Sequence, residues 1–485
     1  MFNFRLKVCF LIAAISVLSP NFASAQTKMQ SELMDLLKSS TLSGAELGLV
    51  VRNLRSGEEL FALNKDHLLI PASNVKIVTT GAALYYLLPD YQFNTEIYGD
   101  ADEEGVISGN LYIKGYGDPW LLPEKVWYIV TQLKRLGIKE VKGSIVADGS
   151  YFAPPHIPQG SEQDSSSAAY MSPAGGLSVG FNAVGVHIKP AKSVGVPATI
   201  SFEPVNNLFT TEGHIMTVSE QVSKILVDTV SERGKNKVWL AGHMNITDKP
   251  KVKWRKVQEA TLYAGEVFKA LLEEQDIVVV GSVKQGFAPE NGNLLFKHRS
   301  LPLSEIVLKV NQYSNNFMSA QLARTLGAEV LGVPGTWSKG KEVLEAFMAK
   351  AGVEPGTYVL GNASGLHDVN SLSAGQITDV LDFMYQQRHL RAEFLASMAV
   401  AGSSGTLKER MRQDDAQYYL RAKTGTLSAA SALSGYVVNR DGDDLVFAFL
   451  VNHYKTPLSE VWDLQDKLGN ILAGSRADTF VVGSR

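Results

Sequence analysis

The middle of this chain, from about residue 99 to residue 290, differs in pattern from both of its ends. Short segments in which apolar and polar residues alternate recur there between Gly, Pro and Asn: 109–115, 143–148 and 184–189. Such alternation predicts short β-strands, interrupted by one helix at 260–274. The flanking segments, among them 73–88 and 317–331, instead repeat apolar residues at helical spacing. We therefore expect a unit of helices and strands that is interrupted by a β-rich insertion.

Strand patterns also lie near both ends of the chain. The segment 45–64 predicts two strands around a Ser-Gly turn, and 431–438 and 445–452 predict two more. A final amphipathic helix at 459–472 is expected to pack on the sheet, because its polar residues are not rich in Lys and Arg as in membrane-surface helices. The polar segment 158–169 is expected to form an exposed loop.

The first 25 residues have the pattern of a secretory signal peptide. Arg5 and Lys7 precede an apolar run at 8–18, and small residues follow at 23–25. A membrane anchor is the alternative, but a helix needs about 20 apolar residues to cross the hydrocarbon region, more than this run supplies. We therefore expect an exported protein that works in the periplasm or cell-wall space, without a transmembrane segment in the mature chain.

Composition argues against several functional classes. Removal of the predicted signal peptide leaves 44 basic and 49 acidic residues without a basic stripe, so nucleic acid is not an expected partner. The only cysteine, Cys9, lies within that peptide, and the nine histidines include no His-Glu-x-x-His motif. We therefore expect neither a metal nor another cofactor.

Three short motifs follow one another along the chain: Ser73-Asn-Val-Lys76, Ser314-Asn-Asn316 and Lys423-Thr-Gly425. In this order they match the Ser-x-x-Lys, Ser-x-Asn and Lys-Thr-Gly set of serine enzymes that react with penicillin. Each motif alone is weak, since Ser-x-x-Lys also occurs at Ser338 and Lys341. We interpret Ser338 as part of a solvated linker, whereas Ser73 is expected at a helix start with Lys76 on the same face. The pattern favours Ser73 as the nucleophile.

The first motif requires a lysine that can lose its proton. A serine hydroxyl is a poor nucleophile until a base removes its proton, and a neutral lysine can be that base. Because the pKa of an unperturbed lysine is about 10.4, burial or a nearby positive charge must lower the pKa of Lys76. Lys423 can supply that charge. Without the other motifs, Lys76 would be interpreted as an exposed helix lysine.

The second motif admits two interpretations. Ser314 can relay a proton to a leaving amine, and the Asn316 amide can bind the substrate backbone. Both residues also lie at the junction of two helical patterns, where Ser and Asn are common as caps, and Ser304 is expected to cap the first of these helices.

The third motif is expected on an edge strand beside a cleft. Lys423 and Thr424 can hold a substrate carboxylate there, and Gly425 permits close approach. The backbone N–H groups of Ser73 and Thr426 can form an oxyanion hole.

A rival nucleophile pattern occurs at Gly176-Leu-Ser-Val-Gly180. It fits the Gly-x-Ser-x-Gly elbow of lipases, which needs a strand before the serine and a helix after it. Here Pro and Gly precede Ser178 and a strand pattern follows. We expect Ser178 to be structural.

Beyond the three motifs, nearly all of the chain after the predicted signal peptide resembles the low-molecular-mass class C penicillin-binding proteins, the D-Ala-D-Ala carboxypeptidase/endopeptidase family that includes penicillin-binding protein 4. The resemblance lies in Gly115-Tyr-Gly-Asp-Pro119, Phe181-Asn182, Ser364-Gly-Leu366, Gly402 to Leu407, Lys423-Thr-Gly-Thr-Leu427 and Leu433-Ser-Gly-Tyr436. The separation of 241 positions between Ser73 and Ser314 leaves room for the large insertion known in this family. The chain departs from the family at Asn362-Ala-Ser-Gly365, often Asp-Gly-Ser-Gly, and at Gly180, often Asn.

The resemblance implies an α/β (α+β) serine β-lactamase/transpeptidase-like domain with an antiparallel sheet flanked by helices, formed by residues 26–98 and 291–485. It also implies two smaller inserted β-rich domains, 99–187 with 247–290, and 188–246. The implied activity is hydrolysis of terminal D-alanine from peptidoglycan stem peptides and of D-alanyl cross-links, with covalent acylation by β-lactams. A β-lactamase and a catalytically idle wall-binding protein are the alternatives.

Overall fold

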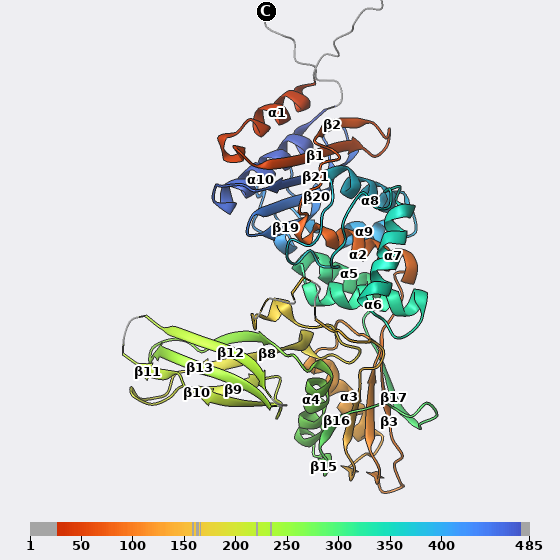
Figure 1. Ribbon diagram of the computed structural model, residues 1–485, viewed down its shortest axis with the longest axis vertical. Helices are drawn as coiled ribbons and strands as arrows, with labels where there is room; N and C mark the ends of the chain where they lie inside the picture. Colours follow the sequence, from red (N-terminus) through yellow and green to blue (C-terminus); the bar gives the residue numbers. More distant parts are fainter. Residues whose placement is uncertain are drawn as a thin grey trace, which may run out of the picture.

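The computed structural model describes residues 27–157, 160–161, 164, 166–219, 222–232 and 235–476, so the predicted signal peptide lies outside the described residues. Figure 1 shows two parts, one made by both ends of the chain and one made by its middle. We call residues 27–93 and 300–476 the main unit and residues 94–299 the insertion.

The main unit is built on a six-stranded antiparallel sheet in the order β18-β19-β20-β21-β1-β2. Its strands are β1 (Glu46–Asn53), β2 (Glu59–Leu63), β18 (Ala399–Val400), β19 (Leu420–Leu427), β20 (Ala430–Val438) and β21 (Asp444–Asn452). The four strands predicted at 45–64, 431–438 and 445–452 are thus present.

Helices cover both faces of this sheet. Alternate residues of β21 enter different cores: Phe447 packs under α1 (Lys28–Leu37) and α10 (Leu458–Gly474), and Ala448 faces the other helices. Those helices are α2 (Val75–Leu87), α5 (Leu303–Tyr313), α6 (Asn316–Leu331), α7 (Trp337–Lys350), α8 (Ala374–Gln386) and α9 (Arg391–Ser397). Burial on both faces explains why β21 is apolar at nearly every position rather than alternating.

The insertion contains further sheets. A five-stranded sheet, β16-β7-β5-β3-β17, and a three-stranded one, β15-β6-β4, share a core with α3 (Pro123–Arg135) and α4 (Ala260–Glu274). The sheet β14-β8-β9 and the sheet of β10 to β13 form the arm at the left of Figure 1.

The strands of the insertion are β3 (Asn94–Tyr98), β4 (Val106–Ile107), β5 (Leu111–Gly115), β6 (Glu140–Val141), β7 (Ile145–Asp148), β8 (Ala183–Lys189), β9 (Thr199–Glu203), β10 (Phe209–Gly213), β11 (Met216–Val218), β12 (Lys224–Glu232), β13 (Lys235–Asn245), β14 (Lys251–Lys256), β15 (Val278–Val279), β16 (Val283–Gln285) and β17 (Leu294–Arg299). Because β3 pairs within the insertion and β8 pairs with both β9 and β14, sheets cross the predicted boundaries, and the division into domains stays a prediction.

Helix α6 joins the main unit to the insertion through buried polar side chains. The Gln321 amide accepts a hydrogen bond from Gly175 N at 2.9 Å and donates one to Gly175 O at 3.0 Å. Arg324 donates to the carbonyls of Ala153, at 3.0 Å, and Pro155. Burial lowers the pKa of Arg324 to about 10. These bonds satisfy backbone groups of two insertion loops that pack against the helix.

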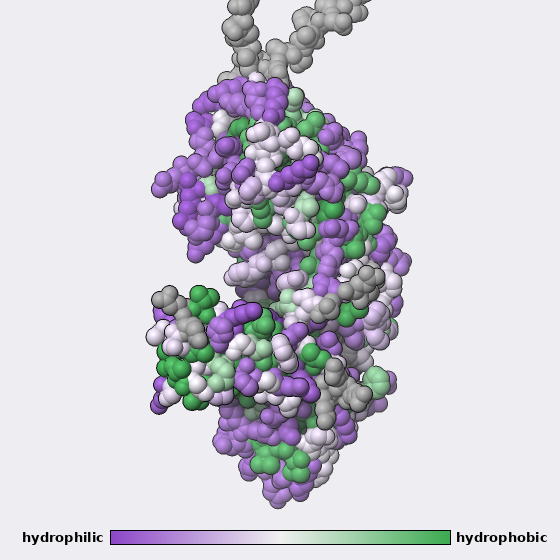
Figure 2. Space-filling view, turned by 60° about the vertical axis from the view of Figure 1, so that its left-hand side comes forward, coloured by the Kyte–Doolittle hydropathy of each residue, from purple (hydrophilic) through white to green (hydrophobic). Residues whose placement is uncertain are grey.

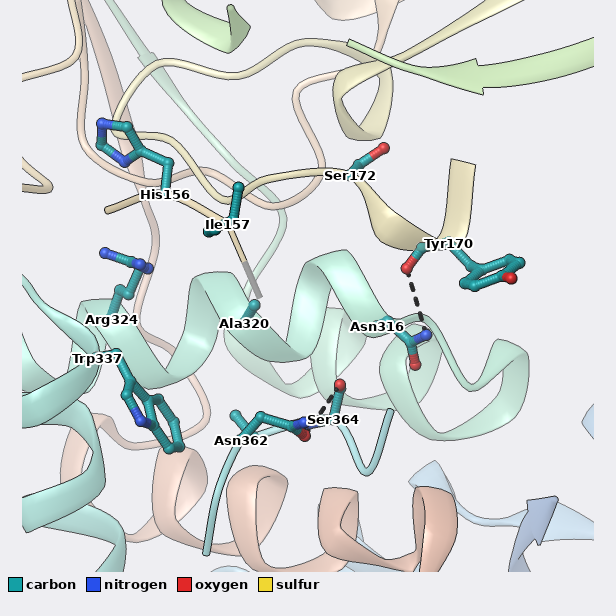
Figure 3. Close-up of a pocket in the computed structure, with 11 residues that line it drawn as sticks. His156, Ile157, Tyr170, Ser172, Asn316, Ala320, Arg324, Trp337, Asn362 and Ser364 are labelled. Carbon is teal, nitrogen blue, oxygen red and sulfur yellow. Dashed lines mark hydrogen bonds between the residues drawn. The ribbon is translucent and has the colours of Figure 1, made fainter. Parts of the chain in front are cut away.

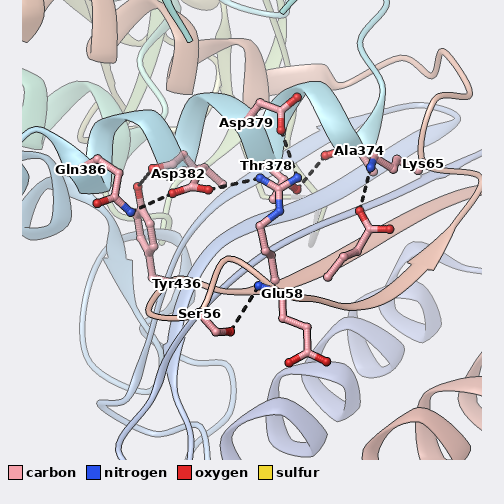
Figure 4. A network of polar contacts seen from close by, with 12 residues as sticks. Ser56, Glu58, Lys65, Ala374, Thr378, Asp379, Asp382, Gln386 and Tyr436 are labelled. Carbon is pink, nitrogen blue, oxygen red and sulfur yellow. Dashed lines mark hydrogen bonds and ion pairs between the residues drawn. The ribbon is translucent and has the colours of Figure 1, made fainter. Parts of the chain in front are cut away.

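An ion-pair network fixes α8 to strand β1 of the sheet. Figure 4 shows Asp379 and Asp382 on the side of α8 that faces the strands. The Arg52 guanidinium of β1 donates to Asp379 at 3.1 Å and to Asp382 at 3.2 Å. The Arg52 side chain is only 15% exposed, so solvent screens these bonds weakly.

Replacement of Arg52 is expected to destabilise the fold. Arg52→Ala leaves two partly buried carboxylates facing each other, so the free energy of unfolding should fall by about 2 kcal/mol. Urea denaturation measures this change. Lys38→Ala is the control, because the exposed Lys38–Asp35 pair should contribute under about 0.5 kcal/mol. Equal losses in the two variants would contradict a stabilising role for the network.

Three local predictions were wrong. Ser304 is the second residue of α5 and not its cap, because carbonyls of Tyr91 and Pro89 accept from the N–H groups of Leu303 and Ser304 and no side-chain cap is needed. Ser338 lies in helix α7 rather than in a linker.

The third correction concerns the segment predicted as an exposed loop. Its described residues include buried Ser161 and Ser167, because the segment folds against the main unit, where Ser161 Oγ lies 3.1 Å from His367 Nε2.

Among the described residues, no helix is both long and apolar enough to span a membrane.

Candidate active site

Ser73 lies in a 3₁₀ turn, η2 (Ala72–Asn74), that leads directly into α2. Ala72 has a φ of 48°, in the left-handed region, so the chain turns sharply just before the serine. Two glycines permit this: a Cβ on Gly365 would lie 1.8 Å from Ala72 O, and one on Gly425 would lie 2.8 Å from Pro71 O. Ser73 is therefore positioned at a helix start, as predicted, by segments distant in sequence.

Lys76, the second residue of α2, lies one turn after Ser73 and is fully buried. Its Nζ donates to Ser73 Oγ at 3.0 Å, to Asn316 Oδ1 at 2.8 Å and to Ser364 O at 2.5 Å. Burial, and secondarily the charge of Lys423, hold the pKa of Lys76 well below its ordinary value. All three polar partners of Nζ are neutral. A neutral amine is therefore accessible at Lys76.

Lys423 is also buried and reaches the second motif from β19. Its Nζ donates to Ser314 Oγ at 2.9 Å and to Thr424 O at 2.7 Å. Burial lowers the pKa of Lys423 to about 7. Two lysines and two serine hydroxyls thus form one polar cluster.

The structure shows which residue of the second motif is a helix cap. Asn315 is the N-cap of α6, and its side chain accepts from Met318 N at 3.0 Å. Ser314 ends α5 with left-handed angles, φ 54° and ψ 37°. Because Asn315 satisfies the helix end, the side chains of Ser314 and Asn316 are directed to the lysines instead.

The third motif lies on a partly open strand. β18 pairs with β19 only at Ala422 and Arg421, so the edge from Lys423 onward has no strand partner on that side among the described residues. Thr424 Oγ1 donates to Thr406 Oγ1 at 2.8 Å, and Thr426 is exposed. A peptide can therefore add to this edge as a further strand.

Ser178 is not part of this cluster. Its hydroxyl is buried, donates to Gly175 O at 3.0 Å and accepts from Asn182 Nδ2 at 2.9 Å. Ser338 Oγ is 2.9 Å from Thr336 Oγ1 at the start of α7. Neither serine contacts a base.

Sequence reasoning assigned no role to Ser364, Thr406 or Asn362. The Ser364 carbonyl accepts from Lys76, and Asn362 Oδ1 accepts from the backbone N–H groups of Ser364 and Gly365, which holds that carbonyl in place. The sequence signal for Ser364 and Thr406 was limited to the glycine-containing segments that carry the family resemblance, Ser364-Gly-Leu366 and Gly402 to Leu407. Asn362 lies in a neighbouring segment that departs from the family pattern. Within the described ranges, no group of three or more His, Cys, Asp or Glu side chains could hold a metal ion.

The profile of the D-Ala-D-Ala carboxypeptidase 3 (S13) family matches residues 29–471, nearly the whole described chain. The chain belongs to this family. Membership in this serine carboxypeptidase family confirms the resemblance inferred from the motifs.

Individual relatives extend over the same range. The chain is 29% identical to a D-alanyl-D-alanine carboxypeptidase of Actinomadura sp. over 464 residues, covering 92% of this chain and 85% of that one. It is 24% identical to the D-alanyl-D-alanine carboxypeptidase DacB of Haemophilus influenzae, covering 92% of each. The crystal structure of H. influenzae penicillin-binding protein 4 superimposes with a TM-score of 0.77 at 23% identity, over 90% of this chain and 97% of that one. The predicted fold class is confirmed.

Two cavities flank the contact between Asn316 Nδ2 and Tyr170 O, 3.4 Å long. The smaller, about 30 Å³, has Asn316 and Ser364 at one end and His156 and Arg324 at the other (Figure 3). The larger, about 390 Å³, lies on the Ser314 side. The candidate active site is therefore bordered by the insertion on both sides of Asn316.

Proposed function

We propose that this member of the family hydrolyses D-alanyl peptide bonds through an acyl-enzyme on Ser73. The observation that carries the proposal is the 3.0 Å hydrogen bond from Lys76 Nζ to Ser73 Oγ at a buried lysine with a lowered pKa. When Lys76 is neutral, the hydrogen bond reverses and the amine takes the serine proton as Oγ attacks the substrate carbonyl.

The remaining motif residues have roles in the same reaction. The N–H groups of Ser73 and Thr426 stabilise the developing oxyanion, and Ser314 passes a proton to the leaving amine. Asn316 binds the substrate backbone, while Lys423 and Thr424 hold the terminal carboxylate beside Gly425. Water then releases the acyl group. No cofactor or metal is required for these steps.

The substrates are peptidoglycan stem peptides and D-alanyl cross-links, and β-lactams acylate the same serine. The structure of H. influenzae penicillin-binding protein 4 in complex with a β-lactam supports a site of this fold as a β-lactam target. The pattern of residues 1–25 supports export to the periplasm or cell-wall space.

Mass spectrometry after penicillin treatment tests the proposal. A long-lived adduct on the peptide that contains Ser73 is expected. Rapid turnover without an adduct would indicate a β-lactamase, and an unreacted protein would indicate a wall-binding module. Identification of the muropeptides released from isolated sacculi then distinguishes carboxypeptidase from endopeptidase activity.

Lys423→Ala is expected to weaken the preference for a substrate with a free terminal carboxylate. A peptide ending in D-alanine presents that carboxylate to Lys423, whereas the corresponding amide does not. Charged hydrogen bonds are worth roughly 1.5–3 kcal/mol, so the ratio of kcat/KM on acid to amide should fall by about one to two orders of magnitude. The kinetics of both substrates with both enzymes measure this ratio.

The pH dependence gives a second readout for Lys423. Its pKa of about 7 in the free protein means that the ammonium is lost as the pH rises through this value, so the wild-type acid preference should decline toward alkaline pH. Equal losses on acid and amide in Lys423→Ala would assign Lys423 to the chemical step and not to carboxylate recognition.

A further inference from the structure

We infer that the larger cavity, beside Ser314, binds the stem peptide that departs when a cross-link is cut. This inference rests on the proposed function. The cavity of about 390 Å³ is lined by three separate segments: the α5–α6 junction of the main unit, the insertion segment around Tyr170 and Phe181, and Trp254 of β14. The surface is visibly hollowed where the insertion meets the main unit (Figure 2).

The position of Ser314 assigns this cavity to the leaving side. Ser314 is the group proposed to protonate the leaving amine, and it lines the larger cavity but not the smaller one. The contact between Asn316 and the Tyr170 carbonyl separates the two cavities, with Ser364 on the far side. Atoms attached to the leaving amine therefore extend toward the larger cavity.

The size of the cavity favours a peptide over a single amino acid. Free D-alanine, which leaves in the carboxypeptidase reaction, is much smaller than 390 Å³. In a cross-link, the leaving amine belongs to a second stem peptide that continues away from the cut bond. Of these two leaving groups, the second stem peptide is the one large enough to fill the cavity.

The walls suit the aliphatic parts of such a peptide. Aromatic side chains of Tyr170, Phe181, Trp254 and Tyr313 line the cavity, and none of the described residues that line it is charged. Trp254 is 45% exposed while its ring packs on Gly185 of β8, where a Cβ would lie 3.0 Å from the indole. The indole is thus held in place with part of its surface free, an arrangement that contributes contact area at low entropic cost.

Trp254→Ala is expected to impair cross-link cleavage selectively. The test compares two sugar-free substrates, a monomeric pentapeptide ending in D-Ala-D-Ala and a cross-linked peptide dimer of the same stem sequence. The ratio of kcat/KM on dimer to pentapeptide should fall about tenfold, as expected for loss of a buried aromatic contact. Trp239→Ala is the matched control, since Trp239 of β13 is 43% exposed on the same arm but does not line the cavity.

Tyr313→Ala is a second variant in case loss of Trp254 disturbs the arm. Tyr313 is 67% exposed, so its removal should spare the fold while lowering the same ratio. An unchanged ratio in both variants overturns the inference, as does an equal fall in Trp239→Ala. A fall seen only with substrates that carry the glycan would assign the cavity to sugar and also overturns it.

The inference and the proposed function fail in different ways. A wild-type protein that hydrolyses the pentapeptide but never the dimer overturns the inference and leaves the function intact. A wild-type protein that hydrolyses neither substrate and forms no β-lactam adduct overturns the proposed function itself.

Discussion

We expect Ser73→Ala to abolish both peptide hydrolysis and β-lactam labelling. The substitution removes the one hydroxyl among the described residues that contacts Lys76 Nζ, so no acyl-enzyme can form. Loss of a nucleophile that works together with its base should lower kcat by at least about 10⁴-fold. Labelling with a fluorescent penicillin and the rate of D-alanine release measure the two effects. The fold should persist, because the Ser73 side chain carries no other hydrogen bond to a described residue.

Ser338→Ala is the matched control for this substitution. Ser338 precedes Lys341 in the same Ser-x-x-Lys spacing, yet it lies on α7 and Lys341 pairs with Glu345. Ser178→Ala tests the second rival in the same way. Both variants should label normally, and persistent labelling of Ser73→Ala would refute the assignment of the nucleophile.

Lys76→Met is expected to lower the acylation rate by about 10²- to 10⁴-fold, the usual contribution of a positioned general base. Methionine keeps an unbranched side chain of similar size in a fully buried position and removes a charge whose burial is unfavourable. Circular dichroism and thermal unfolding should therefore show a folded protein. Stopped-flow measurement of β-lactam acylation gives the rate.

The pH profile separates a base from a packing residue. Lys76 acts in its neutral form, so the wild-type acylation rate should rise with pH as Lys76 loses its proton, at a pH well below the ordinary lysine pKa. Lys76→Met should lack this rise. Lys341→Met, which alters a half-exposed lysine, should keep the wild-type rate and profile. A folded Lys76→Met variant with near-normal acylation would show that Lys76 is a packing residue and not the base.

Local patterns accounted for the elements that carry the site. Apolar residues at helical spacing predicted α2 and α6 within a few residues. Apolar strand patterns on either side of turn residues predicted β1, β2, β20 and β21. Local reasoning failed where a distant segment satisfies the backbone. Ser304 looked like a cap, but carbonyls that follow α2 accept from the first N–H groups of α5.

The three motifs, their order along the chain and the family to which the chain belongs depend on residue identity and spacing alone, so they can be recognised without a structure. The protonation chemistry, in contrast, follows from the three-dimensional fold: the pKa of Lys76 is lowered because residues distant in sequence bury it, among them Asn316 and Ser364, 240 and 288 positions away, and because Lys423 lies nearby. The cavity beside Ser314 likewise exists only because the insertion folds back onto the α5–α6 junction. The burial of a side chain and its distance from other charges depend on contacts between segments that are far apart in the sequence. The periodicity of residues within a short window therefore cannot predict them.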